Sequence, residues 1–382
     1  MRHSPDTPTA VVIDNDMVAG AERHAARLVK ALRDAGRDRT HLIVSRGLFE
    51  QMTAFAEQRT ILQELERDGR LAVIDEHKGG ARALTLARRN RDVWRYARAE
   101  GIKLFHTVLS GHGYALFALI ASGPRVVFEV SSPDVVDKIL AGTMTLSRTL
   151  ERVDLFHAVS PSVQRRLQEG LAANGKHHVA AKVRCNPVPF YRPSPKRDDV
   201  PKEKRVTYAS RFVSRKNPVL FARAARDFLT SHPDWKVSVL GKGSSEEDLT
   251  SEIECELVRE IASGQAYVGF SHDLDRELAR SSIFASTIQP DNYPSQSILE
   301  AMDAGNAIVA TNGGDSSLLA TPANGILVEY DAESITQALR TLADDPSRLR
   351  SCGAASREIV RTQFGPANYL RGLTSVYDEA LT

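Results

Sequence analysis

The sequence predicts an α/β protein made of two doubly wound domains, each with a parallel sheet. Short apolar segments alternate with amphipathic helical segments along most of the chain, which is typical of a parallel sheet with helices on both faces. This alternation stops once, at residues 187–204, where five prolines fall within a charged run. The chain has 382 residues, and single cores stop growing beyond about 250–300 residues. Two domains joined by a linker are therefore expected.

The expected boundaries are residues 1–190 for the first domain, 191–204 for a linker stiffened by proline, and 205–365 for the second domain. Strands of the first domain are predicted at residues 9–13, 41–45, 71–74, 103–109, 125–130, 154–159 and 182–185. Strands of the second are predicted at 206–209, 236–240, 266–268, 283–287, 307–310 and 326–328. The clearest helices are predicted at 20–35, 81–99, 218–229, 331–343, 346–363 and 366–381.

The bulk composition excludes several classes of protein. Hydrophobic residues make up 42%, charged residues 26%, and the mean hydropathy is −0.28, as in soluble globular proteins. No uncharged apolar run reaches the roughly 18 residues of a membrane span, and residues 1–6 show no signal-peptide pattern. Cys185, Cys255 and Cys352 are far apart, so we expect reduced thiols in a cytoplasmic protein and neither a disulfide frame nor a zinc site.

The charge is divided unevenly along the chain. Residues 1–190 hold 28 lysines and arginines against 21 acidic residues, and residues 191–382 hold 22 against 27. A basic half can face an anionic acceptor or an anionic lipid surface, although ordinary solvated surface explains it equally simply. No basic run with interleaved aromatic residues indicates nucleic-acid binding.

Ligands of doubly wound sheets bind at the carboxyl ends of the strands, so the loops there are the candidate site. The loop after the first strand of the second domain holds Arg211, Arg215 and Lys216 within six residues. A guanidinium offers phosphate a planar fork and an ammonium offers a point charge. The loop is therefore a candidate diphosphate clamp, and a solvated basic turn is the alternative.

Residues 289–305 form a second candidate, at the turn between a strand and a helix. Pro294 suits the first turn of that helix, and Asn292 can cap it. Free backbone amides near Ser295 and Ser297 would then lie at the positive end of the helix dipole, which favours anions. Glu300 follows in the helix and suits the hydroxyls of a ribose. An ordinary capped core helix remains the alternative.

Several common functional motifs are absent, and four polar residues of the first domain have more than one possible role. The sequence lacks GxxxxGK[ST], a GxGxxG after its first strand, GxSxG, HExxH and an EF-hand loop, which leaves kinase, nicotinamide, serine-hydrolase, zincin and calcium-sensor functions without support. His106, His112, Glu129 and Asp134 are expected at the mouth of the first sheet, where a histidine could bond sugar hydroxyls or carry a proton. Each of them could also be satisfied inside its own domain.

Five fragments together resemble the retaining, nucleotide-sugar-dependent glycosyltransferases of family four, which have the GT-B fold. The resemblance covers nearly the whole chain and is strongest between residues 205 and 345. The matching fragments are Val18-Ala19-Gly20-Ala21-Glu22-Arg23, Ser210-Arg211-Phe212-Val213 with Lys216, Tyr293-Pro294-Ser295 with Ile298-Leu299-Glu300-Ala301-Met302, Gly305 with Val309-Ala310-Thr311 and Gly313-Gly314, and Asn324-Gly325-Ile326-Leu327-Val328.

This resemblance implies roles for particular residues. Arg211 and Lys216 hold the donor diphosphate and stabilise it as it leaves, and Glu300 binds the donor ribose. Gly20 and the backbone from Ser295 through Ser297 to Ile298 approach donor phosphate or sugar. His106 lies where the family often places a histidine close to the transferred sugar. No metal or other cofactor is expected, because the cations and the helix dipole do that work, and the helix at 366–382 should cross back to the first domain.

Two positions depart from the family pattern. The family usually has another glutamate with seven residues between it and Glu300, but this chain has Asn292 there and an acid, Asp291, one position earlier. Either Asp291 contacts the sugar through a longer loop or Asn292 contacts it as a neutral group. Asn217-Pro218 also stands where glycine commonly follows the lysine, which still permits a helix to begin.

The expected function is transfer of a sugar from a nucleoside diphosphate donor to a hydroxyl acceptor with retention. The acceptor is a glycan or a lipid-linked molecule, and peripheral contact with the inner face of the membrane would suit the basic half. An inverting or phosphorolytic reaction on the same fold is one alternative. A non-catalytic module that binds nucleotide sugars is the other, since the first family glutamate is missing.

Overall fold

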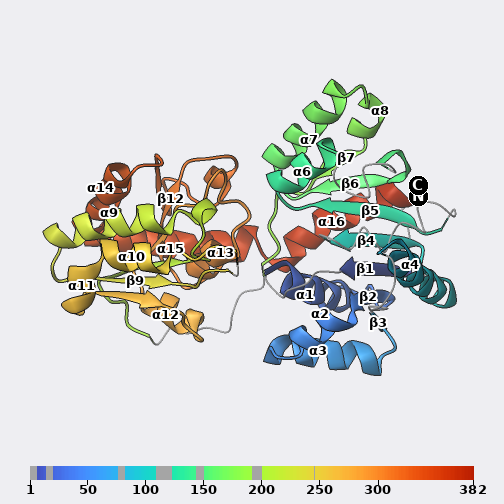
Figure 1. The fold of residues 1–382 in the computed structure, drawn as a ribbon, viewed down its shortest axis with the longest axis horizontal. Coiled ribbons are helices and arrows are strands. Elements are labelled where there is room, and N and C mark those ends of the chain that lie inside the picture. Colours follow the sequence, from blue (N-terminus) through green and yellow to red (C-terminus); the bar gives the residue numbers. More distant parts are fainter. Residues whose placement is uncertain are drawn as a thin grey trace. The chain divides into compact units, whose positions relative to one another are not determined.

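The computed structural model describes residues 7–13, 20–75, 82–108, 123–142, 150–191, 200–244 and 246–382. The chain divides into two compact units (Figure 1). The first contains Met1–Phe190 together with Pro366–Thr382, and the second contains Tyr191–Gly365. Each unit is described by itself.

The first unit contains a seven-stranded sheet in the order β3-β2-β1-β4-β5-β6-β7, with every neighbouring pair parallel. Its strands are β1 Thr9–Ile13, β2 Thr40–Ser45, β3 Leu71–Ile74, β4 Leu104–Val108, β5 Arg125–Val130, β6 Leu155–Ala158 and β7 Val183–Cys185. Its helices are α1 Gly20–Asp34, α2 Arg46–Met52, α3 Ala56–Arg67, α4 Arg82–Ala99, α6 Pro133–Leu140, the 3₁₀ helix η3 Leu150–Arg152, α7 Pro161–Ala173, α8 His177–Ala180 and α16 Pro366–Leu381.

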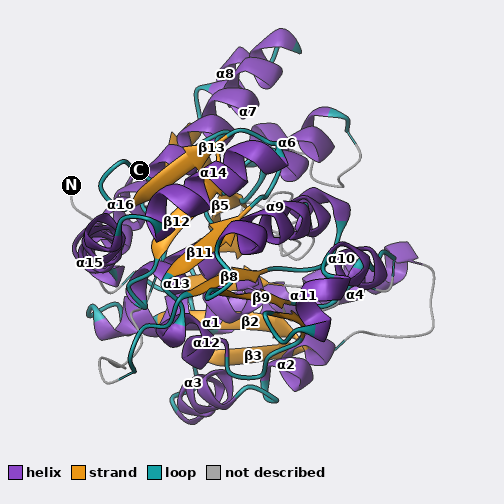
Figure 2. Ribbon diagram, turned by 90° about the vertical axis from the view of Figure 1, so that its left-hand side faces the viewer, coloured by secondary structure: helices purple, strands orange, loops and turns teal. Residues whose placement is uncertain are grey.

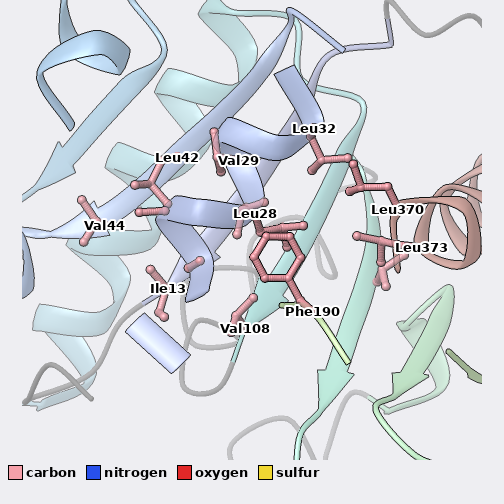
Figure 3. Packing of buried hydrophobic residues seen from close by; sticks show 14 of the residues in the cluster. Ile13, Leu28, Val29, Leu32, Leu42, Val44, Val108, Phe190, Leu370 and Leu373 are labelled. Carbon is pink, nitrogen blue, oxygen red and sulfur yellow. The ribbon is translucent and has the colours of Figure 1, made fainter. Parts of the chain in front are cut away.

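Alternating side chains of these strands enter two cores, one on each face of the sheet. One core joins Val12, Phe105 and Phe128 to helices α4, α6 and α7. The other joins Val11 and Leu104 to helices α1, α2, α3 and α16. Figure 3 shows this second core. Residues of α1 and α16 lie there beside strand residues and beside Phe190. The C-terminal helix therefore completes the apolar face of a sheet formed from the beginning of the chain.

The second unit contains a six-stranded parallel sheet in the order β10-β9-β8-β11-β12-β13. Figure 2 shows its strands among helices. The strands are β8 Arg205–Ala209, β9 Lys236–Leu240, β10 Ala266–Gly269, β11 Ile283–Ser286, β12 Ala307–Thr311 and β13 Gly325–Val328. The helices are the 3₁₀ helices η4 Ser214–Lys216 and η5 Ser316–Leu318, and α9 Pro218–Ser231, α10 Thr250–Glu256, α11 Val258–Ala262, α12 Leu274–Arg280, α13 Gln296–Asp303, α14 Ala332–Ala343 and α15 Pro346–Gln363.

One core of the second unit joins β8, β9, β11 and β12 to helices α9 and α14, with Phe221 and Phe228 among its fully buried side chains. Helix α13 contacts β11, β12 and helix α15. Strand β8 lies near the middle of the sheet, where the strand order changes direction. The loops after β8 and β11 therefore emerge side by side at the carboxyl edge, which is where doubly wound sheets bind ligands.

The predicted fold class is confirmed, since both units are parallel sheets with helices. Several predicted elements coincide with observed ones, including β1, β9 and the C-terminal helices α15 and α16. None of the described helices combines the length and the apolar character that crossing a bilayer requires.

Candidate active site

The predicted phosphate loop begins directly after strand β8. Its first anchor is Phe212, which is fully buried and whose backbone N–H donates to the Lys242 carbonyl at 3.0 Å. Gly241 has no room for a side chain, because a Cβ atom there would lie 1.9 Å from the Ser210 carbonyl oxygen. This close backbone packing holds the loop after β8 against the loop after β9. The Arg211 side chain is left exposed to solvent.

The second anchor lies at the other end of this loop. The Lys216 carbonyl accepts hydrogen bonds from the hydroxyls of Tyr208 at 2.8 Å and Thr287 at 2.9 Å. Asn217 follows with a φ of 49°, a left-handed conformation that glycine and asparagine adopt most readily. Its amide donates to the Thr287 carbonyl at 3.0 Å, and helix α9 then begins at Pro218. Asn217, which replaces the family's glycine, thus adopts a left-handed backbone conformation that glycine also adopts readily.

The structure corrects the predicted start of the helix in residues 289–305. Helix α13 begins at Gln296, and its N-cap residue is Ser295, whose side chain makes no capping hydrogen bond. Pro294 therefore precedes the helix, and Asn292 does not cap it. The physical reason is that the Asn292 side chain is held by other partners.

Asn292 is 2% exposed, and hydrogen bonds use both ends of its side chain. Its Oδ1 accepts from the Ser286 hydroxyl at 2.7 Å. Its Nδ2 donates to the Thr311 carbonyl at 2.8 Å and lies 3.1 Å from the Ser316 hydroxyl. The Asn292 amide is thus enclosed by these partners, which favours Asp291 as the residue that contacts the donor sugar; which of the two makes that contact stays a prediction. Ser316 was not singled out by its sequence, although it follows the glycine pair closely.

Asp291 is half-buried, and its carboxylate organises the same loop. It accepts hydrogen bonds from the backbone N–H groups of Tyr293 at 2.8 Å and Asp315 at 3.0 Å. Gly314 has a φ of 52°, and a Cβ atom there would lie 2.2 Å from the Asp291 carboxylate. The second glycine of the pair in the donor signature therefore makes room for this acid. A contact between Asp291 and a sugar stays a prediction.

Helix α13 turns its apolar side chains into the unit. Ile298 is 0% exposed, so only its backbone can take the predicted part in donor binding. The hydroxyls of Ser295 and Ser297 lie 3.1 Å apart at the start of the helix. Glu300 is half-buried, and its carboxylate lies near Tyr191, whose pKa is raised by burial and by the neighbouring acids.

A network at the far end of α13 was not predicted from the sequence. Asp303 is 7% exposed, and its carboxylate accepts from Arg361 Nε at 3.1 Å and from the Tyr191 hydroxyl at 3.2 Å. Arg357 donates to the Ala304 carbonyl at 3.1 Å. These contacts fix the helix that carries Glu300. The only hint in the sequence is an acid at the end of an apolar helical run.

The structure describes only some of the predicted site residues of the first unit. Gly20 is the first residue of helix α1, at the carboxyl edge of β1. The loop before it, residues 14–19, and the loop at 109–122, which includes His112, lie outside the described residues. Asp134 is exposed in the first turn of α6.

His106 lies inside the first unit and not at the mouth of its sheet. It is 0% exposed, its Nδ1 lies 2.8 Å from the Tyr377 hydroxyl of α16, and burial lowers its pKa. Glu129 is 4% exposed, with Oε2 3.3 Å from His106 Nε2. The expected place of His106 at the mouth of the sheet is therefore corrected, because Tyr377 of α16 covers it, and its contact with the transferred sugar stays a prediction. Glu129 is likewise a core residue.

Solved structures share the fold of this chain. A glycosyltransferase from Rickettsia africae aligns with a TM-score of 0.72 and 16% identity over 98% of both chains. The Anabaena protein HepE, crystallised with UDP and glucose, aligns with a TM-score of 0.70 and 16% identity over 97% of this chain and 98% of its own. At this identity the likeness shows the fold, which is GT-B.

Two family models match the sequence. "Glycosyltransferase Family 4" matches residues 18–181, and "Glycosyl transferases group 1" matches residues 203–345. The chain belongs to this family of glycosyltransferases. The match therefore confirms the resemblance that the five fragments indicated.

Curated relatives match less than half of this chain. A GDP-mannose-dependent monoacylated alpha-(1-6)-phosphatidylinositol monomannoside mannosyltransferase of Corynebacterium glutamicum is 27% identical over 164 residues, which are 41% of this chain and 42% of the relative. An alpha-maltose-1-phosphate synthase of Mycolicibacterium smegmatis is 27% identical over 188 residues, 45% of this chain and 47% of that protein. The matching segments thus span less than half the length of these relatives.

Proposed function

We propose that this protein transfers a sugar from a nucleoside diphosphate donor to a hydroxyl acceptor with retention of configuration. The observation that carries the proposal is the loop after β8, where Phe212 and the Lys216 carbonyl fix the backbone and Arg211 is exposed. Arg211 and Lys216 would bind the diphosphate and offset its charge as it leaves. Glu300, on the rigidly held helix α13, would bind the ribose hydroxyls.

The acid nearest the sugar in this proposal is Asp291, since Asn292 is enclosed. The acceptor is a glycan or a lipid-linked molecule. The relative from Corynebacterium, whose name includes a phosphatidylinositol mannoside, supports testing lipid acceptors, and the basic first half of the chain suits a site at the cytoplasmic membrane surface. We propose that the reaction needs no metal ion, because Arg211 and Lys216 would offset the charge of the leaving group.

The test compares Arg211→Ala and Lys216→Ala with Lys236→Ala, which removes an equal charge from an exposed position at the amino end of strand β9. A thermal-shift screen of UDP-, GDP- and ADP-sugars first identifies the donor, because binding to the native state raises the melting temperature. We expect kcat/KM to fall about 100-fold or more in the first two variants and to change little in the control. NMR of the product anomer then reports retention.

Three results would contradict the proposal. Equal activity of all three variants would show that Arg211 and Lys216 do not bind the donor diphosphate. An inverted product anomer removes retention. Donor binding with no transfer to a panel of glycan and lipid acceptors favours a non-catalytic nucleotide-sugar-binding module.

A further inference from the structure

Three neighbouring strands of the first unit bring polar side chains together inside the core. Glu129 of β5 pairs in register with His157 of β6, and His106 of β4 pairs with Val127, two residues before Glu129. Because side chains alternate along a strand, all three polar groups project from the same face. That face is covered by helix α16, through Tyr377.

The three side chains are almost completely buried, at 0% exposure for both histidines and 4% for Glu129. Within the described part of the chain, the geometry of His106 Nε2, Glu129 Oε2 and His157 Nδ1 satisfies no hydrogen bond, although Glu129 Oε2 lies 3.3 Å from His106 Nε2 and 3.6 Å from His157 Nδ1. Buried polar atoms without partners are rare in native proteins, because nothing replaces the water they lose. Each such atom therefore requires an explanation.

These three atoms converge on one point. His106 Nε2 lies 3.3 Å from Glu129 Oε2, His157 Nδ1 lies 3.6 Å from the same oxygen, and all three are within 4.8 Å of one another. Ligands at about 2.0–2.2 Å around a tetrahedral zinc ion stand roughly 3.4 Å apart. The two distances to the carboxylate match this spacing, and the imidazole nitrogens, which lie within 4.8 Å of each other, would approach each other by up to about 1.4 Å on binding the ion.

We propose that His106, Glu129 and His157 bind a divalent transition-metal ion, with Zn²⁺ as the first candidate. Imidazole nitrogen and carboxylate oxygen are ligands that zinc accepts. Metal-binding histidines usually place their second ring nitrogen in a hydrogen bond. His106 meets this requirement, because its Nδ1 lies 2.8 Å from the Tyr377 hydroxyl.

The ion has a structural role in this proposal. It cross-links strands β4, β5 and β6 beneath α16, all within the first unit, whereas Arg211, Lys216 and Glu300 belong to the second. It balances the charge of a carboxylate that is buried between two histidines. The metal site therefore stands or falls independently of the proposed transfer reaction.

The experiment uses the untagged full-length chain after treatment with EDTA and dialysis. Zinc is added against a chromophoric competitor, and melting is followed by the fluorescence of Trp94, which lies in the first unit, in a Trp235→Phe background. We expect about one tightly bound Zn²⁺ per chain and a zinc-dependent rise in the melting temperature of the first unit. Cobalt(II) should give a visible spectrum of low-coordinate nitrogen and oxygen ligation.

The matched variants are Glu129→Gln, which keeps the shape and removes the charge, and His178→Ala, which disrupts an exposed histidine–glutamate pair with Glu151 at 3.7 Å. Zinc binding and the thermal shift should be lost in the first and retained in the second. If Glu129→Gln does not fold, the cobalt spectrum of the natural chain decides whether the three side chains bind a metal ion. A solvated-cobalt spectrum, or a melting temperature that neither zinc nor EDTA changes, overturns the proposal in favour of a proton-sharing network.

Discussion

At the scale of single residues, Asn292 holds the loop before helix α13 together. Its amide connects three segments that are distant in sequence, through Ser286, Thr311 and Ser316. Removing the amide would take away the partner of the Ser286 hydroxyl and of the Thr311 carbonyl, whereas the Ser316 hydroxyl keeps its bond to the Gly313 carbonyl at 2.6 Å. Each buried group left unsatisfied costs about 1–3 kcal/mol. The residue therefore stabilises the loop that carries the donor signature.

We predict that Asn292→Ala lowers the free energy of unfolding of the second unit by about 2–4 kcal/mol. Each unit contains one tryptophan, so urea unfolding in a Trp94→Phe background lets Trp235, which is 3% exposed, report on the second unit alone. The control is Asn312→Ala, at an exposed position, with an expected change within about 0.5 kcal/mol. Equal effects at both positions would show that the amide contributes nothing specific.

Asn292→Asp adds a sharper outcome. It restores an acid at the position where the family has glutamate, but a carboxylate oxygen would then face the Thr311 carbonyl, which now accepts from the amide at 2.8 Å. We therefore expect a loss of stability and no gain in turnover. Higher turnover with full stability would mean that this position does contact the donor.

At the scale of elements, strand β2 and helix α4 are joined by a buried histidine. His41 is 0% exposed, its Nδ1 lies 2.8 Å from the Tyr96 hydroxyl, and Arg70 lies 3.3 Å from its other nitrogen. Burial, assisted by nearby arginines, lowers the pKa of His41 from 6.5 to about 4. The folded unit therefore holds this imidazole neutral.

The sign of the pH effect follows from this shift. Between pH 6.5 and 4 the unfolded chain protonates His41 while the folded chain resists, so the stability present above pH 6.5 is lost as the pH falls. We predict that His41 contributes a decrease of at most about 3 kcal/mol in the free energy of unfolding of the first unit across this range. Trp94 fluorescence in a Trp235→Phe background measures it.

His41→Gln should flatten the pH dependence, and the exposed control His177→Gln should not. The other buried histidines are present in both variants, so the difference between them isolates His41. Identical slopes in the two variants would refute the assignment.

Elements were predictable to the extent that local sequence specifies them. Strands such as 9–13 and 236–240 are short, mostly apolar segments between polar turns, and helices α15 and α16 begin at prolines that suit a first helical turn. The depth of His106 was not predictable, because its cover is Tyr377, 271 positions later in the chain. The role of Asn292 was missed for the same reason, since Thr311 and Ser316 reach it only in the folded unit.

At the scale of the whole molecule, the two units differ in how the chain forms them. The second is one continuous stretch, Tyr191–Gly365, and it contains Arg211, Lys216 and Glu300. The first is discontinuous and requires α16, in which Leu373 and Tyr377 are fully buried. The Asn186 amide also donates to the Tyr369 carbonyl at 3.0 Å. Residues 1–190 alone would expose the apolar face that α16 covers.

This difference predicts the behaviour of fragments. A fragment of residues 191–365 should fold, bury Trp235 and bind the nucleoside diphosphate with an affinity within about tenfold of the intact chain, which is roughly 1.4 kcal/mol.

Residues 1–190 should aggregate, because an uncovered apolar face of this size favours association. Joining 1–190 to 366–382 through a flexible glycine–serine linker should restore a soluble, cooperatively melting unit. A joined fragment carrying Leu373→Asp, which places a charge in the core, should aggregate again. If residues 1–190 alone melted like the joined fragment, α16 would not be part of the first core, and if residues 191–365 folded without binding nucleotide, the donor site would require more than the second unit.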